Sequence, residues 1–292
     1  MSLFNVFILA IVQGLAELLP VSSSAHVVVV EKLMGLDPSS PPMTLLLVML
    51  HTGTMFAVIA YFWKQWRGTY FSSAAAFQAI AVRLVVATAI TGIIGYAIKE
   101  VIERTALRDV PHSEIEDLFG HLEFIAPALA AVGVLILVAG LRESRLRRAT
   151  GPDSGEISLS GAAIIGGVQG LCLPFRGFSR SGATISTGML IGVAKPRAER
   201  FSFALAVVLT PPIVAREVLR LVHAPPGAAT AAQGSLQSVV LLSVLGAVLA
   251  FIAGLLALKW LSRWLESGRW YLFGVYCLVA AVGVALLHHR GF

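Results

Sequence analysis

The first stretch with the residue types of phosphoryl chemistry is residues 13–26, which read QGLAELLPVSSSAH within an apolar run. Gln13 and Glu17 are four residues apart and would share one face of a helix. A serine cluster and His26 follow Pro20 directly. Ionisable residues at membrane depth are functional candidates by default, and a serine beside a base is a candidate nucleophile. The alternative reading is that Glu17 and His26 only satisfy buried backbone groups.

The second stretch is residues 174–186, which read PFRGFSRSGATIS. A guanidinium such as that of Arg180 presents a fork of donors that matches phosphate oxygens. We expect Gly177 and Gly182 to let backbone N–H groups approach an anion, and Thr184 to begin the returning helix, whose positive end favours phosphate. The alternative is that Arg180 extends to the membrane interface. The residues expected to bind an anionic substrate are Arg180, Ser179, Thr184, Gln13, Ser22 and Ser181.

The composition places both stretches in a membrane protein. The 292 residues are 57% hydrophobic and only 13% charged, with a mean hydropathy of +0.83. A soluble domain has about a quarter of its residues charged. The apolar runs are about 20 residues long, which fits spanning helices and not the alternating strands of a barrel. The net charge of +6 comes from basic residues between these runs, so it favours a topology signal over nucleic-acid binding.

The apolar runs predict an all-α polytopic fold with six spanning helices. They lie at about 43–63, 79–100, 124–141, 202–222, 236–258 and 270–288. Two further apolar stretches, residues 2–34 and 157–194, are interrupted by polar residues and proline. Each is predicted to form a re-entrant helical hairpin, since irregular backbone survives at membrane depth only inside protein or beside a wet cavity.

The order of hairpin and three spans occurs twice, which predicts an inverted repeat. The sequence VQGL at residues 12–15 returns at 168–171, and a proline and a serine cluster follow each copy. The repeats would cover about 1–145 and 157–292 of one membrane domain. Because three spans separate the hairpins, the second must enter from the opposite side. Such repeats place their site near the membrane midplane, where the two copies meet.

Basic residues gather between alternate spans, near 64–83, 142–157, 195–200 and 259–269, while the segment 100–123 is acidic. Positively charged loops stay inside. We therefore expect both termini outside, the first hairpin to enter from outside and the second from inside.

The two polar stretches, in this order, resemble the undecaprenyl-diphosphatase (bacitracin-resistance protein) family. The matching motifs are Gln13, Glu17, Pro20-Val21-Ser22-Ser23 and His26, and then Gly177-Phe178-Ser179-Arg180-Ser181 with Thr184. The resemblance covers nearly the whole chain through the span count and the repeat. Gln13 stands where many members have glutamate, which weakens the case for a metal ligand there. Phe175 and Arg176 also depart from the family's second motif, and Arg176 has a structural or lipid-headgroup role as an alternative to catalysis.

The resemblance implies hydrolysis of undecaprenyl diphosphate to the monophosphate, which recycles a carrier lipid of peptidoglycan synthesis. It implies a bacterial cytoplasmic membrane, a site facing outward, and a divalent cation, expected to be Mg²⁺, with Glu17 as a candidate ligand. As a hypothesis, Ser23 attacks the terminal phosphorus, His26 accepts its proton and Glu17 orients His26. His26 as the nucleophile stays open.

The main rival from another class is a transporter or flippase of a lipid-linked or small anion, because broken helices and inverted repeats are transporter features. A phosphatase of another lipid phosphate is the third reading. The partners expected are a polyprenyl diphosphate and membrane lipids, with no nucleic acid. The sequence leaves the oligomeric state open, a homodimer included. His51 and Thr54 are weaker candidates for the lining of a cavity.

Overall fold

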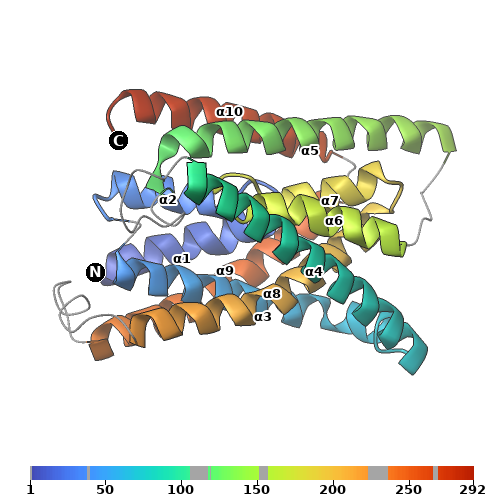
Figure 1. Cartoon of the computed structure of the whole chain (residues 1–292), viewed down its shortest axis with the longest axis horizontal. Helices are drawn as coiled ribbons and strands as arrows, with labels where there is room; N and C mark the ends of the chain where they lie inside the picture. Colours follow the sequence, from blue (N-terminus) through green and yellow to red (C-terminus); the bar gives the residue numbers. More distant parts are fainter. Residues whose placement is uncertain are drawn as a thin grey trace.

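The computed structural model describes residues 2–37, 40–105, 118, 120–150, 157–222, 236–265 and 269–292, apart from some side chains near helix ends. Its described elements are all helices, arranged roughly along one direction, with both chain termini at the same end (Figure 1). Three segments that hold part of the predicted topology signal, 106–117, 151–156 and 266–268, lie outside the described residues, and so does the segment 223–235.

Six long helices confirm the predicted polytopic fold. They are α3 (Pro41–Thr69), α4 (Ala74–Thr105), α5 (Leu122–Thr150), α8 (Lys195–Val222), α9 (Leu236–Leu265) and α10 (Tyr271–His289). Each contains a window apolar and long enough to cross a membrane, and each predicted span lies within one of them to within a residue. The chain is a multi-pass membrane protein.

The basic residues assigned to loops lie largely on helices instead. Lys64 and Arg67 lie in the last turns of α3. Arg83 lies in α4, and Lys195 is the first residue of α8. A hydrocarbon core about 30 Å thick needs only about 20 helical residues. Helices of 28 to 32 residues therefore extend beyond it, and their charged ends replace part of the expected loops.

Four short helices form two hairpins, α1 (Leu3–Leu18) with α2 (Ser23–Leu33) and α6 (Leu159–Cys172) with α7 (Arg180–Leu190). At 1.5 Å per residue, the 16 residues of α1 reach about 24 Å, which is short of a full crossing. Each short helix begins after a serine whose side chain accepts a hydrogen bond from a backbone N–H three residues on. These capping residues are Ser2, Ser22, Ser158 and Ser179. Such caps satisfy N–H groups that a helix leaves unpaired.

The two hairpins pack on the long helices in a reciprocal way. Helix α1 packs on α9, and α6 packs on α4. The glycines of the two VQGL copies sit at these contacts, because a side chain on Gly14 would meet the α9 backbone and one on Gly170 would meet Ile94 and the α4 backbone. This exchange is what an inverted repeat would produce. The division of the chain into two repeats remains a prediction.

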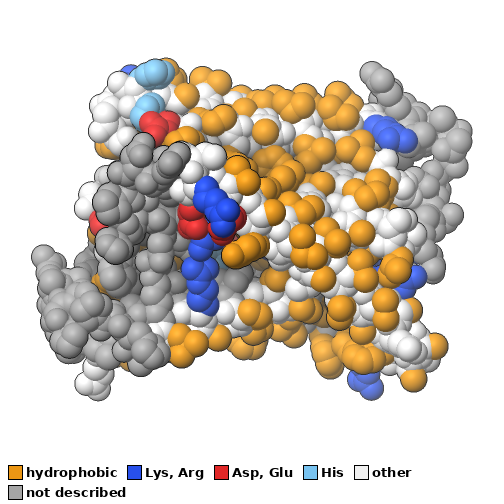
Figure 2. All heavy atoms as spheres, in the orientation of Figure 1, with side chains coloured by type: hydrophobic (Ala, Val, Ile, Leu, Met, Phe, Trp, Pro, Cys, Tyr) orange, Lys and Arg blue, Asp and Glu red, His pale blue; other side chains and the backbone are white. Residues whose placement is uncertain are grey.

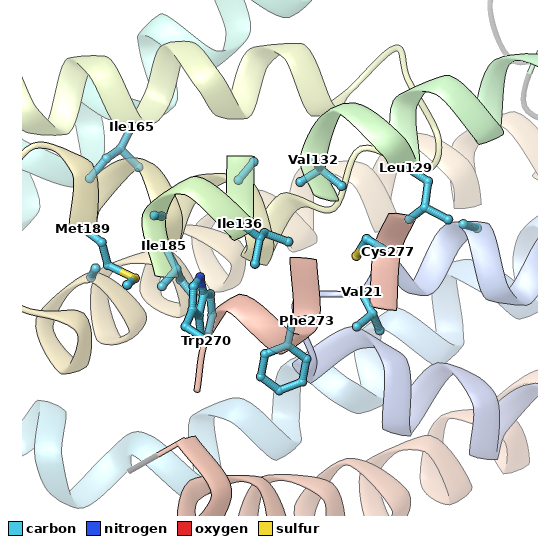
Figure 3. Close-up of a cluster of buried hydrophobic side chains, with 14 of the residues drawn as sticks. Val21, Leu129, Val132, Ile136, Ile165, Ile185, Met189, Trp270, Phe273 and Cys277 are labelled. Carbon is cyan, nitrogen blue, oxygen red and sulfur yellow. The ribbon is translucent and has the colours of Figure 1, made fainter. Parts of the chain in front are cut away.

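A buried apolar cluster holds the second hairpin against α5 and α10. Figure 3 shows Ile136 of α5, Ile185 of α7 and Trp270 beside α10 pointing into it. Trp270 also donates a hydrogen bond from Nε1 to Ser186 Oγ at 3.0 Å. Dense packing of this kind holds α7 in place against α5 and α10.

Hydrophobic side chains cover the middle of the face seen in Figure 2, and charged side chains gather toward its ends. Among the exposed apolar residues, Ile93, Leu241 and Val279 each leave more than 60% of their surface uncovered. A continuous apolar surface on long helices is what lipid tails would cover.

Candidate active site

The two hairpin tips meet at one cavity of about 210 Å³, as the repeat argument predicts for two polar loops. Ser22, Ser23 and Ser24 line it from the first hairpin, and Phe178 to Ser181 line it from the second. The other polar residues of the lining are Glu17, His51, Thr54, Gln169 and Thr210. The tips also contact each other directly, since the Gly177 N–H points to Ser24 Oγ at 3.5 Å.

Glu17 joins the two hairpins and is the centre of the polar contacts. Its Oε1 accepts a hydrogen bond from Arg180 Nη2 at 2.7 Å. Its Oε2 accepts from Ser23 Oγ at 2.5 Å and from Gln13 Nε2 at 3.0 Å. His51 Nε2 of α3 lies 3.5 Å from the same oxygen. The carboxylate therefore contacts a candidate nucleophile and a candidate phosphate-binding cation at once.

Two helices begin at the cavity, which gives it an anion-binding character beyond Arg180. Helix α2 begins at Ser23 and α7 at Arg180, so both N-terminal ends lie among the lining residues. The N–H groups and dipole of a helix N-terminus favour negative charge. The sequence pointed to one such helix end, and the structure brings two together.

The backbone of the tips is shaped for close contact. Ser22 adopts φ 67° and ψ 89°, a left-handed conformation that is uncommon for residues with a side chain. A side chain on Gly182 would lie 2.7 Å from Ile136 and 3.0 Å from the Pro20 carbonyl oxygen. Gly182 therefore allows the two tips to approach each other, rather than only an anion as the sequence suggested. Unusual backbone conformations of this kind gather at functional sites.

His26 differs from its expected place between Ser23 and Glu17. Its Nδ1 lies 2.7 Å from the Ser22 carbonyl oxygen, and its Nε2 lies 2.7 Å from Tyr276 Oη, with the two rings stacked. A carbonyl only accepts, so Nδ1 carries the proton, and in the neutral ring Nε2 accepts from Tyr276. Glu17 contacts Ser23 without His26 between them.

Three further predicted residues take supporting positions. Thr184 does not begin a helix but lies in the second turn of α7, fully buried, with its hydroxyl 2.6 Å from Ser202 Oγ. Helix α7 already has its first turn at Arg180, capped by Ser179. Gln13 is buried behind Glu17. Arg176 is outside the cavity lining, and its charge acts on the buried Glu31.

His51, a weaker candidate by sequence, and Gln169, which was not predicted as a site residue, both line the cavity. His51 lies on a spanning helix, where an ionisable residue is itself a signal. Gln169 is fully buried, and its amide nitrogen lies 3.3 Å from the Thr91 hydroxyl. The repeated VQGL motif indicated Gln169, because it occupies the same place in the second copy as Gln13 in the first. Tyr276 had no comparable signal.

The donor set of the cavity fits a cation held mainly by substrate. Among the described residues no group of three or more His, Cys, Asp or Glu side chains could hold a metal. Mg²⁺ in phosphate sites is bound through one or two carboxylates together with substrate oxygens and water. Glu17 supplies one carboxylate to the cavity, whereas Gln13 Oε1, which has no hydrogen-bond partner, is buried outside the cavity lining.

Comparison with known proteins finds similarity along nearly the whole chain. The family model of the bacitracin resistance protein BacA matches residues 6–283. The chain is 57% identical over 286 residues to undecaprenyl-diphosphatase 2 of Acinetobacter baylyi, covering 98% of each chain. It is 36% identical to the undecaprenyl-diphosphatase of Desulfosudis oleivorans over 96% of each chain, and 34% identical to that of Acidiphilium cryptum over 95%.

Proposed function

Because the chain belongs to the bacitracin resistance protein BacA family, we propose that it hydrolyses undecaprenyl diphosphate to undecaprenyl phosphate and inorganic phosphate. The observation that carries the proposal is Glu17, which contacts the Ser23 hydroxyl and the Arg180 guanidinium from one carboxylate. These contacts support Ser23 as the nucleophile, Glu17 as the proton acceptor and Arg180 as the phosphate-binding group. The reaction would return the carrier lipid to peptidoglycan synthesis.

The diphosphate would bind at the two helix N-termini. A guanidinium has five N–H donors, and the contacts to Glu17 and to the Ser202 carbonyl involve two of its nitrogens. Arg180 can therefore hold phosphate oxygens while it stays in place. Fixed donors of this kind stabilise the charge that develops on the transferring group. The hydroxyls of Ser22 and Ser181 extend the same set.

The first step would transfer the terminal phosphoryl group to Ser23. Its Oγ attacks the terminal phosphorus as the bond from that phosphorus to the bridging oxygen breaks, and undecaprenyl phosphate leaves. The Ser23 proton passes to Glu17 Oε2, which already accepts the Ser23 hydrogen bond. In the second step, water attacks the phosphorus of the phosphoserine and the bond from phosphorus to Ser23 Oγ breaks. Glu17 returns the proton to Ser23 Oγ, and inorganic phosphate leaves with the oxygen and protons of the water.

His26 Nε2 remains the alternative nucleophile, because it carries the ring's lone pair when Nδ1 is protonated. That route requires Tyr276 to release Nε2 and the ring to turn into the cavity. The Ser23 route requires no such movement, so the geometry favours it.

A divalent cation, proposed to be Mg²⁺, would be held by Glu17 and substrate oxygens. It would supply neutralisation of the diphosphate charge. Glu17 would then both bind the cation and accept the proton of Ser23. The Arg180 and Gln13 contacts hold its carboxylate in position for both.

The lipid tail would leave the cavity along its apolar wall. Val58 of α3 and Val207 and Leu209 of α8 line the cavity with the polar residues. We propose that the hairpins are re-entrant and that the site opens to the outer side of a bacterial cytoplasmic membrane. The shortness of the hairpin helices and the common end of both termini support this arrangement.

The test is release of phosphate from undecaprenyl diphosphate by the purified protein in detergent. The parent is expected to turn over, and Ser23→Ala and Arg180→Ala to lose a hundredfold or more. Ser72→Ala, at an exposed serine between α3 and α4, is the matched control. Phosphate release from other lipid diphosphates but not this one would change the substrate. No release at all would favour the transporter, which the comparisons do not support.

A further inference from the structure

A second cavity, of about 390 Å³, lies among the opposite ends of the helices and is lined by three arginines. Arg83 comes from α4, and Arg197 and Arg200 come from the first turns of α8. Thr69 and Tyr70, at the end of α3, add two hydroxyls. Of the described residues that line it, none is acidic. We name this the arginine pocket.

The arginine pocket is separate from the candidate active site. Thr54 of α3 lines the active-site cavity, and Thr69 of the same helix lines the arginine pocket. Fifteen residues of helix separate them, about 22 Å at 1.5 Å per residue. The phosphatase proposal uses none of the pocket's arginines.

The arginines are held around one space. Arg83 donates from Nε to the Ile157 carbonyl oxygen at 2.5 Å and from Nη1 to the Ala79 carbonyl oxygen at 2.9 Å, which fixes its guanidinium at the wall. Burial raises the pKa of Tyr70 to about 12, while the nearby charges of Arg200 and Arg83 act against that rise. The two arginines from different helices therefore both act on Tyr70. The charge of Arg200 also acts on Glu199, which lies outside the lining and interacts with Lys195 and Glu143.

Aromatic residues place the arginine pocket at the level of the membrane interface. Trp63, Phe71 and Phe77 are each about half exposed. The Trp63 ring is tilted against Phe71 with ring centroids 5.9 Å apart, and Phe71 stacks on Phe77 with ring centroids 5.7 Å apart. Trp and Tyr are enriched at the headgroup level of a bilayer, and Trp63 and Tyr70 both lie at this end of α3. Phe71 follows Tyr70 in the turn after α3, and Phe77 follows Ala76 in the first turn of α4. Tyr70 and Ala76 both line the pocket.

We propose that the arginine pocket binds the phosphate headgroup of an anionic membrane phospholipid in the leaflet opposite the candidate active site. Arginine forks match phosphate oxygens, and basic pockets between spanning helices bind anionic headgroups. The aromatic stack beside the pocket would lie against the acyl chains. A free phosphate has the same headgroup chemistry, but it would gain nothing from that apolar border.

The test measures lipid binding by native mass spectrometry of the purified protein in a neutral detergent. Phosphatidylglycerol is compared with phosphatidylcholine of the same acyl chains. The parent is expected to bind its first molecule of phosphatidylglycerol at least tenfold more tightly than its first molecule of phosphatidylcholine. Arg197→Gln/Arg200→Gln is expected to lose that preference, and Arg67→Gln, an exposed arginine at the same end, is expected to keep it.

Three results would overturn the proposal. An equal loss in Arg67→Gln would show general surface charge, and a loss only in Arg180→Gln would place the lipid in the candidate active site. Full competition by millimolar inorganic phosphate would make the ligand a soluble anion. Thermal unfolding without lipid checks that each variant folds. If the double variant does not fold, Arg200→Lys replaces it, because lysine keeps the charge but lacks the planar fork of donors. Arg200→Lys is expected to weaken phosphatidylglycerol binding at least threefold. Unchanged binding would contradict the proposal.

Discussion

Replacing Glu17 with glutamine tests the mechanism at its centre. The substitution keeps the shape of the side chain but removes the charge that pairs with Arg180 at 2.7 Å and the acceptor of the Ser23 proton at 2.5 Å. Loss of a positioned general base costs about 10²–10⁴ in rate, which is about 3–5 kcal/mol of transition-state stabilisation. We expect kcat for phosphate release from undecaprenyl diphosphate to fall by that factor.

The assay compares Glu17→Gln with Glu123→Gln, an exposed carboxylate at the start of α5. Both are measured at saturating substrate and Mg²⁺, with thermal unfolding as a check on folding. The control is expected to stay within twofold of the parent. A folded Glu17→Gln protein with more than a tenth of the parent kcat would refute the assignment of Glu17 as proton acceptor.

Three further predictions concern stability and the cation. Burial raises the pKa of Glu31 to about 7, and the charge of Arg176 opposes that rise. At pH 9, where Glu31 is ionised, Arg176→Gln should therefore lower the free energy of unfolding by roughly 1–3 kcal/mol. A second substitution, Glu31→Gln, should restore most of the loss in thermal unfolding, and no recovery would show that the two residues do not interact. Gly182→Ala should lower the free energy of unfolding by about 1–3 kcal/mol, because the added methyl group would overlap Ile136 and the Pro20 carbonyl. Gly92→Ala, in open space within α4, should instead raise it by about 0.5–1 kcal/mol. Equal effects of the two substitutions would contradict the close packing of the tips. Removal of divalent cations with a chelator should abolish phosphate release and Mg²⁺ should restore it, and full activity in the chelator would exclude the proposed cation.

The sequence predicted the six spans well because their signal is local. An apolar run of about 20 residues is visible without knowledge of any partner. The helix ends were less predictable, since charged residues such as Arg67 and Lys195 are compatible with either a loop or a helix that extends beyond the membrane. The structure places both on helices.

The pairing of the two hairpin tips could also be predicted, because the VQGL repeat relates them. The individual contacts between the two tips could not be predicted. Glu17 and Arg180 are 163 residues apart, and their contact depends on how α1 packs on α9 and α7 on α5. The turn of His26 toward Tyr276 depends on a residue 250 positions away. Sequence proximity favoured a contact of His26 with Ser23 instead.

The most direct test of the central claim is to trap the phosphorylated enzyme. Undecaprenyl diphosphate labelled in its terminal phosphate is mixed with the protein, quenched and digested. We predict an acid-stable label on the peptide that contains Ser23, absent from Ser23→Ala and present in a folded His26→Gln protein that still reacts. An acid-labile label on His26, or turnover at the parent rate by Ser23→Ala, would contradict the account.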